Sequence, residues 1–245
     1  MNYRAVVQYD GSNYYGFQVQ TKQPHHTVQK AIEDAIEKLT GQRTRVAASG
    51  RTDRGVHARA QVISFQLDTS IPVGSLPVAL NNILPSDVRI DSLRTVSAGF
   101  HARFSCRNKT YRYIIDTRKR TDVFSRKYAW HLPYPLDVDA MHEAALCLTG
   151  THDFSSFARK AGRYETCIRT VLQCQVRKSR NRILVDITAD GFLQGMVRNI
   201  VSMLVDVGQG KRSAADVARI LDARSRGCIG VPAPACGLYL WRVTY

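Results

Sequence analysis

The segment Ala48–Ala60, ASGRTDRGVHARA, places a single carboxylate, Asp53, between two arginines, Arg51 and Arg54, with a glycine on either side. Nearby positive charge keeps a carboxylate ionised, and an ionised carboxylate can act as a nucleophile or as an ion-pair partner. Asp53 is therefore a candidate for chemistry. Asp and Gly also favour turns for local hydrogen-bonding and backbone reasons, so an ordinary turn residue is the alternative interpretation.

Other groups of reactive side chains fail on spacing. His142-Glu143 begins like the helix of a zinc protease, but Leu146 stands where the second histidine is needed. The segment Gly208–Lys211 resembles the end of a phosphate-binding loop, yet Arg212 replaces the Ser or Thr that holds magnesium. No G-x-S-x-G motif occurs. Four further histidines lack metal-ligand spacing: His25, His26, His101 and His152. The sequence therefore predicts no metal site, and simple side chains must do any chemistry.

The charge of the chain suits a nucleic-acid partner, since 35 Lys and Arg face 20 Asp and Glu, a formal charge of +15. Residues 157–182 hold eight cations and one acid, Glu165. Residues 101–120 hold seven cations and one acid, Asp116, interleaved with Phe104, Tyr111 and Tyr113. These seven are Arg103, Arg107, Lys109, Arg112, Arg118, Lys119 and Arg120. Cations attract phosphates and aromatic rings stack on unpaired bases, so the pattern predicts an RNA-binding surface. A merely solvated basic face is the alternative.

Two groups of elements must position these residues. In the first half, alternating apolar residues predict strands, and an apolar stripe between the N-cap Thr27 and Gly41 predicts a helix. The expected order is a strand at 3–9, that helix, a strand at 63–67, a short helix at 76–84 and a strand at 88–96.

The second half repeats the theme. Its expected elements are a strand at 111–115, a helix at 138–148, a hairpin at 170–188, a helix at 194–207, a helix opening at Ser213-x-x-Asp216 and a strand at 238–245. This order predicts an α+β fold in two halves, 1–105 and 106–245, each a sheet with helices packed on one face.

The cysteines and apolar segments indicate a cellular compartment. Six cysteines lie scattered with no C-x-x-C pair, which is typical of reduced thiols in a cytosolic protein. The first ten residues hold no apolar stretch long enough for a signal peptide, and no stretch approaches the length of a membrane span. We therefore expect a cytoplasmic protein with no membrane partner.

Residues 50–58, GRTDRGVHA, resemble the nucleophile motif of the tRNA pseudouridine synthase A family, whose aspartate corresponds to Asp53. Similar blocks extend over nearly the whole chain in the family's order. They are YDGS at 9–12, GFQ at 16–18, FHARF at 100–104, KTYRY at 109–113, GTHDF at 150–154, FL at 192–193, MVRNI at 196–200 and GLYL at 237–240. Three positions depart from the common pattern: the family's commonest nucleophile motif has Ala where Arg54 stands, and its helix often carries His where Gln194 stands and Gly where Ser202 stands.

The resemblance implies a fold and an activity. The fold would be the pseudouridine synthase fold, two RRM- or ferredoxin-like halves with antiparallel or mixed sheets joined side by side around a central active-site cleft. The activity would be isomerisation of uridine to pseudouridine in the anticodon stem-loop of tRNA, at positions 38 to 40. It would need no cofactor and no metal, and the family typically works as a homodimer. The uridine must leave the stem to be reached, at a cost of a few kcal/mol in stacking and pairing.

The resemblance also implies residue roles. Asp53 would add to the ribose C1′ or the uracil C6, or assist glycal formation, with Arg198 as its cationic partner. Tyr111 would stack on the target base and is a candidate for handling the C5 proton. Arg51 would contact the flipped nucleotide or its phosphate, and Leu240 would lie near the pocket. Without the resemblance, Arg198 reads equally as an exposed helix arginine and Tyr111 as a core residue.

Two other functions remain open at this point. The chain could be a non-catalytic protein whose RRM-like sheets bind structured RNA and position a partner. It could also be a structural component of a ribonucleoprotein, which the charge alone supports.

Overall fold

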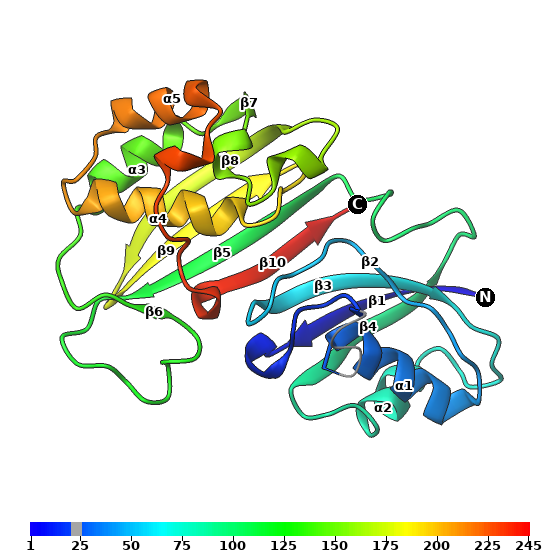
Figure 1. Ribbon diagram of the computed structural model, residues 1–245. Coiled ribbons are helices and arrows are strands. Elements are labelled where there is room, and N and C mark those ends of the chain that lie inside the picture. Colours follow the sequence, from blue (N-terminus) through cyan, green and yellow to red (C-terminus); the bar gives the residue numbers. More distant parts are fainter. Residues whose placement is uncertain (21–25) are drawn as a thin grey trace. The chain divides into compact units, whose positions relative to one another are not determined.

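The computed structural model describes residues 1–20 and 26–245, so His25 lies outside the described part. The chain forms two compact units, one of residues 1–107 with 239–245 and one of residues 108–238 (Figure 1). The division expected from the sequence puts the last strand in the second half, 106–245. In the structure this strand pairs with a strand of the first unit, which explains why residues 239–245 belong there.

The first unit has a β-α-β-β-α-β order. Its elements are β1 (Asn2–Tyr9), α1 (Val28–Thr40), β2 (Ala47–Ala48), β3 (His57–Gln66), α2 (Leu76–Asn81), β4 (Val88–Val96) and the C-terminal β10 (Leu238–Thr244). The antiparallel strands follow the order β4-β1-β3, with β2 also paired to β3. Strand β10 lies parallel to the start of β3. Helices α1 and α2 cover one face of this sheet (Figure 1).

Helix α1 forms where its capping residues and apolar stripe predict it. The Thr27 side chain accepts a hydrogen bond from the Lys30 N–H, and Gly41 ends the helix in the left-handed conformation, with φ of 74°. Val28, Ile32 and Ile36 are fully buried. The strand expected at 63–67 is longer than predicted, because β3 begins at His57.

The second unit is an antiparallel sheet of order β5-β9-β8-β7, with a short strand β6 parallel to β5. Its elements are β5 (Asn108–Asp116), β6 (Trp130–His131), α3 (Val138–Leu146), β7 (Gly150–Asp153), β8 (Ile168–Ser179), β9 (Arg182–Ala189), α4 (Met196–Gly208) and α5 (Ala214–Ala223). The described residues also form five short 3-10 segments: Gly11–Asn13, Ser155–Phe157, Ala161–Arg163, Arg226–Cys228 and Ala235–Gly237.

Local signals in this unit behave as predicted, with one refinement. The capping box of α5 is present between Ser213 and Asp216. The sequence indicates a turn at 177–182 within the hairpin, but the strands continue to Ser179 and Arg182, so only two residues connect them. Arg180, the first of the two, adopts the left-handed φ of 54° that such hairpins need.

Both units are sheets packed against helices, so the predicted α+β class is confirmed. Buried side chains of strands and helices form the core of each unit, including Tyr3, Ile63 and Leu80 in the first and Tyr113, Phe157 and Ile200 in the second. None of the helices in the described part of the chain is both long and apolar enough to span a bilayer.

Candidate active site

Asp53 lies in the loop between β2 and β3, residues 49–56, which we call the aspartate loop. The Val56 N–H donates to the Asp53 carbonyl at 3.2 Å, and Gly55 has φ of 77°, so Asp53 opens a tight turn. The turn interpretation of this segment is thus right for the backbone. The Asp53 side chain is half-buried.

The segment that follows β1 holds the aspartate loop from one side. The buried hydroxyls of Tyr9 and Thr52 lie 2.8 Å apart in a hydrogen bond. The Phe17 N–H donates to the Thr52 carbonyl at 3.1 Å, and the Gly55 N–H donates to the Tyr14 carbonyl at 3.3 Å. These bonds fix the residues immediately before and shortly after Asp53.

Two glycines allow this close approach. A Cβ at Gly11 would lie 2.0 Å from the Val56 carbonyl oxygen, and one at Gly16 would lie 2.5 Å from the Thr52 carbonyl oxygen. Gly16 also has φ of 103°, a conformation that side chains with a Cβ rarely adopt. Any other residue at either position must displace the aspartate loop or its own segment.

Strand β3 holds the start of the loop. The buried Gln61 side chain accepts a hydrogen bond from the Ser49 hydroxyl at 2.7 Å and donates to the Gly50 carbonyl at 2.8 Å. Buried polar groups need such partners, because an unpaired one costs about 1–3 kcal/mol. Gln61 and Ser49 therefore specify the geometry of the loop. The sequence does not predict this role, because the alternation in β3 marks only its apolar residues.

The two arginines beside Asp53 have their own contacts. The Arg54 guanidinium lies over the Tyr15 ring, 4.4 Å from its centre, as a cation–π pair. Arg51 is exposed, and its Nε donates to the Gln18 side-chain oxygen at 3.1 Å. Both arginines thus contact the segment between β1 and α1, and Arg51 remains accessible to a ligand.

Leu240 lies in β10, fully buried and in register with Ala58 of β3. Its neighbour Tyr239 stacks on the His57 ring, with 4.8 Å between ring centres. The His57 Nδ1 accepts a hydrogen bond from the Gly11 N–H at 3.1 Å. The C-terminal strand is therefore packed against the end of the aspartate loop, and Leu240 is part of the core of the first unit.

The second unit carries the other two predicted site residues. Tyr111 is a buried residue of β5, and its ring meets Phe192 edge to face, with 4.9 Å between centres. Phe192 and Tyr111 belong to two of the sequence blocks that carry the family resemblance. An edge-to-face partner fixes the plane of the tyrosine ring.

Arg198 lies in the first turn of α4, half-buried. Its Nε donates to the Ala233 carbonyl at 2.5 Å, and the Ala233 N–H donates to the Arg198 carbonyl at 3.2 Å. The exposed-helix interpretation is therefore wrong, because both the side chain and the backbone of Arg198 are joined to the segment before β10.

Tyr113 supports the same segment. Its hydroxyl donates to the Pro234 carbonyl at 2.7 Å, and a Cβ at Gly237 would lie 2.7 Å from its ring. Burial raises the pKa of the Tyr113 phenol, and the positive charge of Arg198 partly opposes that shift. Burial likewise raises the pKa of the Cys236 thiol, again against Arg198. Arg198 thus lies beside a neutral phenol and thiol.

The structure also separates the cations of the 101–120 cluster. Arg112 makes a bidentate ion pair with Asp186, at 2.7 and 2.8 Å. Arg118 pairs with Asp116 and Asp122. Both arginines belong to the cluster that predicts an RNA-binding surface, but their charges are largely paired with carboxylates of the protein.

Within residues 1–20 and 26–245, no group of three His, Cys, Asp or Glu side chains could hold a metal ion.

Comparison with known proteins defines the class. The family model described as tRNA pseudouridine synthase matches residues 5–105 and 144–245, more than half of the chain. The chain therefore belongs to the tRNA pseudouridine synthase family, and it has the pseudouridine synthase fold. Asp53, Arg51, Arg198 and Leu240 lie within the matched segments, and Tyr111 lies between them.

Individual relatives match over almost their full length. The chain is 47% identical to tRNA pseudouridine synthase A of Brevibacillus brevis over 242 residues, 99% of this chain and 98% of the relative. The protein of the same name from Halalkalibacterium halodurans is 45% identical over 95% of this chain and 88% of its own length. That of a Thermoanaerobacter species is 43% identical over 100% and 99%.

The resemblance to the tRNA pseudouridine synthase A family is thereby confirmed, and the protein is an isomerase that forms pseudouridine from uridine. The two non-catalytic alternatives, an RNA-binding module and a structural ribonucleoprotein component, are not supported.

Proposed function

We propose that this protein isomerises uridine to pseudouridine at positions 38 to 40 in the anticodon stem-loop of tRNA, with Asp53 as its nucleophile. The observation that carries this proposal is the aspartate loop. Hydrogen bonds on both sides fix its backbone, while Asp53 is half-buried and follows the exposed Arg51 by two residues. A carboxylate in a preorganised loop suits covalent chemistry on a nucleoside.

The reaction breaks the bond between ribose C1′ and uracil N1 and forms a bond between C1′ and uracil C5. N1 gains a proton and C5 loses one, so the product has the composition of the substrate. A carboxylate can hold the reacting fragment while the base turns and is regenerated at the end. No electrons are exchanged, and we propose that no cofactor takes part.

The second unit contributes the remaining groups. Arg198, held by Ala233, has the role that the family resemblance gives it, the cationic partner of the catalytic carboxylate. Tyr111, held edge to face by Phe192, stacks on the flipped uracil and lies near its C5 proton. In this proposal residues 1–105 carry the nucleophile, and residues 106–245 carry the tyrosine and the arginine.

The peripheral roles follow the same proposal. Arg51 contacts the flipped nucleotide or its phosphate, as a guanidinium does well, and the buried Leu240 supports the pocket from the core. The protein acts in the cytoplasm as a homodimer that holds tRNA, with no membrane and no small-molecule partner.

The test is the isosteric variant Asp53→Asn, assayed by release of tritium from C5-labelled uridine in tRNA transcripts and by mapping of the modified positions. Turnover should fall by at least about a thousandfold, because the amide is not a nucleophile, while tRNA affinity measured by filter binding should stay within about threefold. The matched control is Asp68→Asn, an exposed acid just after β3, which should leave both quantities unchanged. Undiminished turnover in Asp53→Asn would show that Asp53 is not the nucleophile. Modification confined to tRNA positions other than 38 to 40 would contradict the proposed target positions.

A further inference from the structure

Residues 117–129 connect β5 and β6 and form a loop that several side-chain hydrogen bonds hold together, which we call the basic loop. Its sequence is TRKRTDVFSRKYA. The segments that match the family model end at 105 and resume at 144, so the basic loop is not part of what the model describes.

Arg118 organises this loop from inside. Its guanidinium bonds to both carboxylate oxygens of Asp116, to Asp122 at 3.0 Å and to the Ser125 hydroxyl at 2.7 Å. Its backbone carbonyl lies 2.8 Å from the His131 Nε2. Asp116 is only 2% exposed, and the hydrogen bond from Arg118 is the main reason that its pKa falls to about 2. The loop is therefore held by ion pairs of Arg118, whose side chain is 31% exposed, with the buried Asp116 and with Asp122.

Asp122 folds the tip of the loop. Its side chain accepts a hydrogen bond from the Phe124 N–H at 3.0 Å, and its carbonyl accepts from the backbone N–H groups of Ser125 and Arg126. The Arg126 guanidinium donates to the Val123 carbonyl. This turn places the side chains of Val123 and Phe124 in solvent, 58% and 86% exposed.

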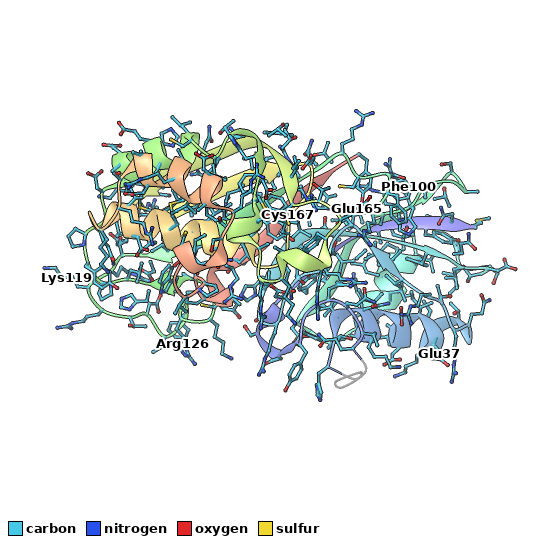
Figure 2. The ribbon with its side chains drawn as sticks, turned by 45° about the horizontal axis from the view of Figure 1, so that its top comes forward. Glu37, Phe100, Lys119, Arg126, Glu165 and Cys167 are labelled. Carbon is cyan, nitrogen blue, oxygen red and sulfur yellow. The ribbon has the colours of Figure 1, made fainter. Side chains whose placement is uncertain are left out.

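Exposed cations flank the two apolar side chains in the sequence of the basic loop. Lys119, Arg120, Arg126 and Lys127 are all exposed, and no carboxylate in the described part of the chain forms an ion pair with Lys119 or Arg120. Figure 2 shows Lys119 and Arg126 on this loop, outside the helices and strands of the second unit. In this loop, Arg118 forms ion pairs within the protein, while a phenyl ring and four other cations are exposed. Exposed aromatic rings and cations are typical of surfaces that bind single-stranded RNA.

We infer that the basic loop is a second tRNA contact, in which Phe124 stacks on an unpaired base while Lys119 and Arg120 neutralise the adjacent phosphates. The inference rests on the proposed tRNA substrate, but the loop itself does no chemistry. A protein partner would also cover an exposed phenyl ring. The charge around it favours RNA, because four exposed cations repel another chain of net charge +15.

The experiment measures tRNA binding separately from turnover. Phe124→Leu keeps an apolar side chain but removes the ring, and it should weaken tRNA binding about tenfold, the lower part of the range for one stacked base. The turnover of Phe124→Leu at saturating tRNA should be unchanged. Phe124→Tyr keeps an aromatic ring and should bind tRNA as tightly as the unmodified protein. The positional control is Leu146→Ala, which truncates an apolar residue on α3 that is 54% exposed and should have no effect.

The cations have their own readout. The double variant Lys119→Ala, Arg120→Ala should lower the slope of log Kd against log salt by about 1.5 to 2, because two phosphate contacts are lost. The control is the double variant Lys38→Ala, Arg89→Ala, on α1 and β4, which removes the same charge. Its slope should stay within about 0.5 of the wild-type value, because only the net charge has changed.

Three outcomes would overturn the inference. Phe124→Leu could bind tRNA as tightly as the unmodified protein, or Phe124→Tyr could fail to restore binding, or Phe124→Leu could change the sedimentation coefficient of the free protein, which would assign the loop to contact between protein chains. Failure of the proposed function would give a different result. An active Asp53→Asn variant would contradict the role of Asp53 as nucleophile, but it would not change the tRNA binding expected of the Phe124 variants.

Discussion

Replacement of Gly16 tests whether the geometry of the aspartate loop controls catalysis. In Gly16→Ala the new Cβ would lie 2.5 Å from the Thr52 carbonyl oxygen, whereas ordinary contact begins at 3.4 Å. Thr52 directly precedes Asp53, so relief of this clash moves the carboxylate by up to about 1 Å, a displacement that can cost about a hundredfold in rate. The φ of 103° adds about 1–3 kcal/mol of backbone strain.

The matched control is Gly41→Ala. Gly41 also has a left-handed φ, 74°, but its Cβ would meet nothing within 4 Å, and it ends α1 away from the aspartate loop. This variant should lose about 1–2 kcal/mol of stability and keep its activity. The assays are thermal unfolding and kcat/KM for pseudouridine formation, with both variants measured well below their midpoints. The reasoning is refuted if Gly16→Ala, correctly folded, keeps a kcat/KM within threefold of that of Gly41→Ala.

Two further predictions concern the second unit. Because Arg118 lowers the pKa of the buried Asp116 from 3.8 to about 2, ionised Asp116 contributes about 2 kcal/mol to stability above pH 5, and this contribution is lost as the pH falls from about 4 to 2. Urea unfolding should therefore show Asp116→Asn about 2 kcal/mol less stable than the unmodified protein at pH 7, with a gap of about 1 kcal/mol at pH 3; an equal gap at both pH values would contradict this. Arg198→Lys keeps the charge but loses the planar donor that bonds to Ala233, so kcat should fall at least about tenfold while the Kd for tRNA stays within about threefold; equal losses in kcat and affinity would argue against a catalytic role.

Much of the fold could be predicted because its signals are local. The Thr27 and Gly41 caps and the apolar stripe between them define α1, and alternation defines β1 and β4 within one residue. The start of β3 could not be found in this way, since His57, Gln61 and Ser64 are polar yet buried and interrupt the apolar alternation. The place of the last strand also escaped prediction, because its pairing with β3 joins residues about 180 positions apart in the chain and has no local signal.

The site divides in the same way. Asp53 could be singled out because a lone acid among arginines is unusual in sequence, and the family resemblance supplied Tyr111 and Arg198. The residues that bond to the site residues or to the aspartate loop have no recognisable pattern in the sequence. Gln61, Ala233 and Pro234 act through a side chain or a carbonyl whose partner lies 10 or more residues away, and only the fold shows those distances. Likewise, the charges of Arg112 and Arg118 counted equally with that of Lys119 until the structure showed which were paired.

The polar residues around the aspartate loop explain why the loop has one conformation. Apolar side chains in place of Tyr9, Ser49, Thr52 and Gln61 could fill the same volume, but dispersion contacts are non-directional and would allow the loop to slide. A buried hydroxyl or amide has a preferred direction, and a shift that breaks its bond leaves an unsatisfied group at about 1–3 kcal/mol each. With the Tyr9–Thr52 and Ser49–Gln61–Gly50 bonds broken together, displacement of the loop would cost a large part of the 5–15 kcal/mol that stabilises a typical domain. The chain thus fixes the position of Asp53 with the same bonds that stabilise the first unit, and a substitution that frees the carboxylate must also weaken the fold.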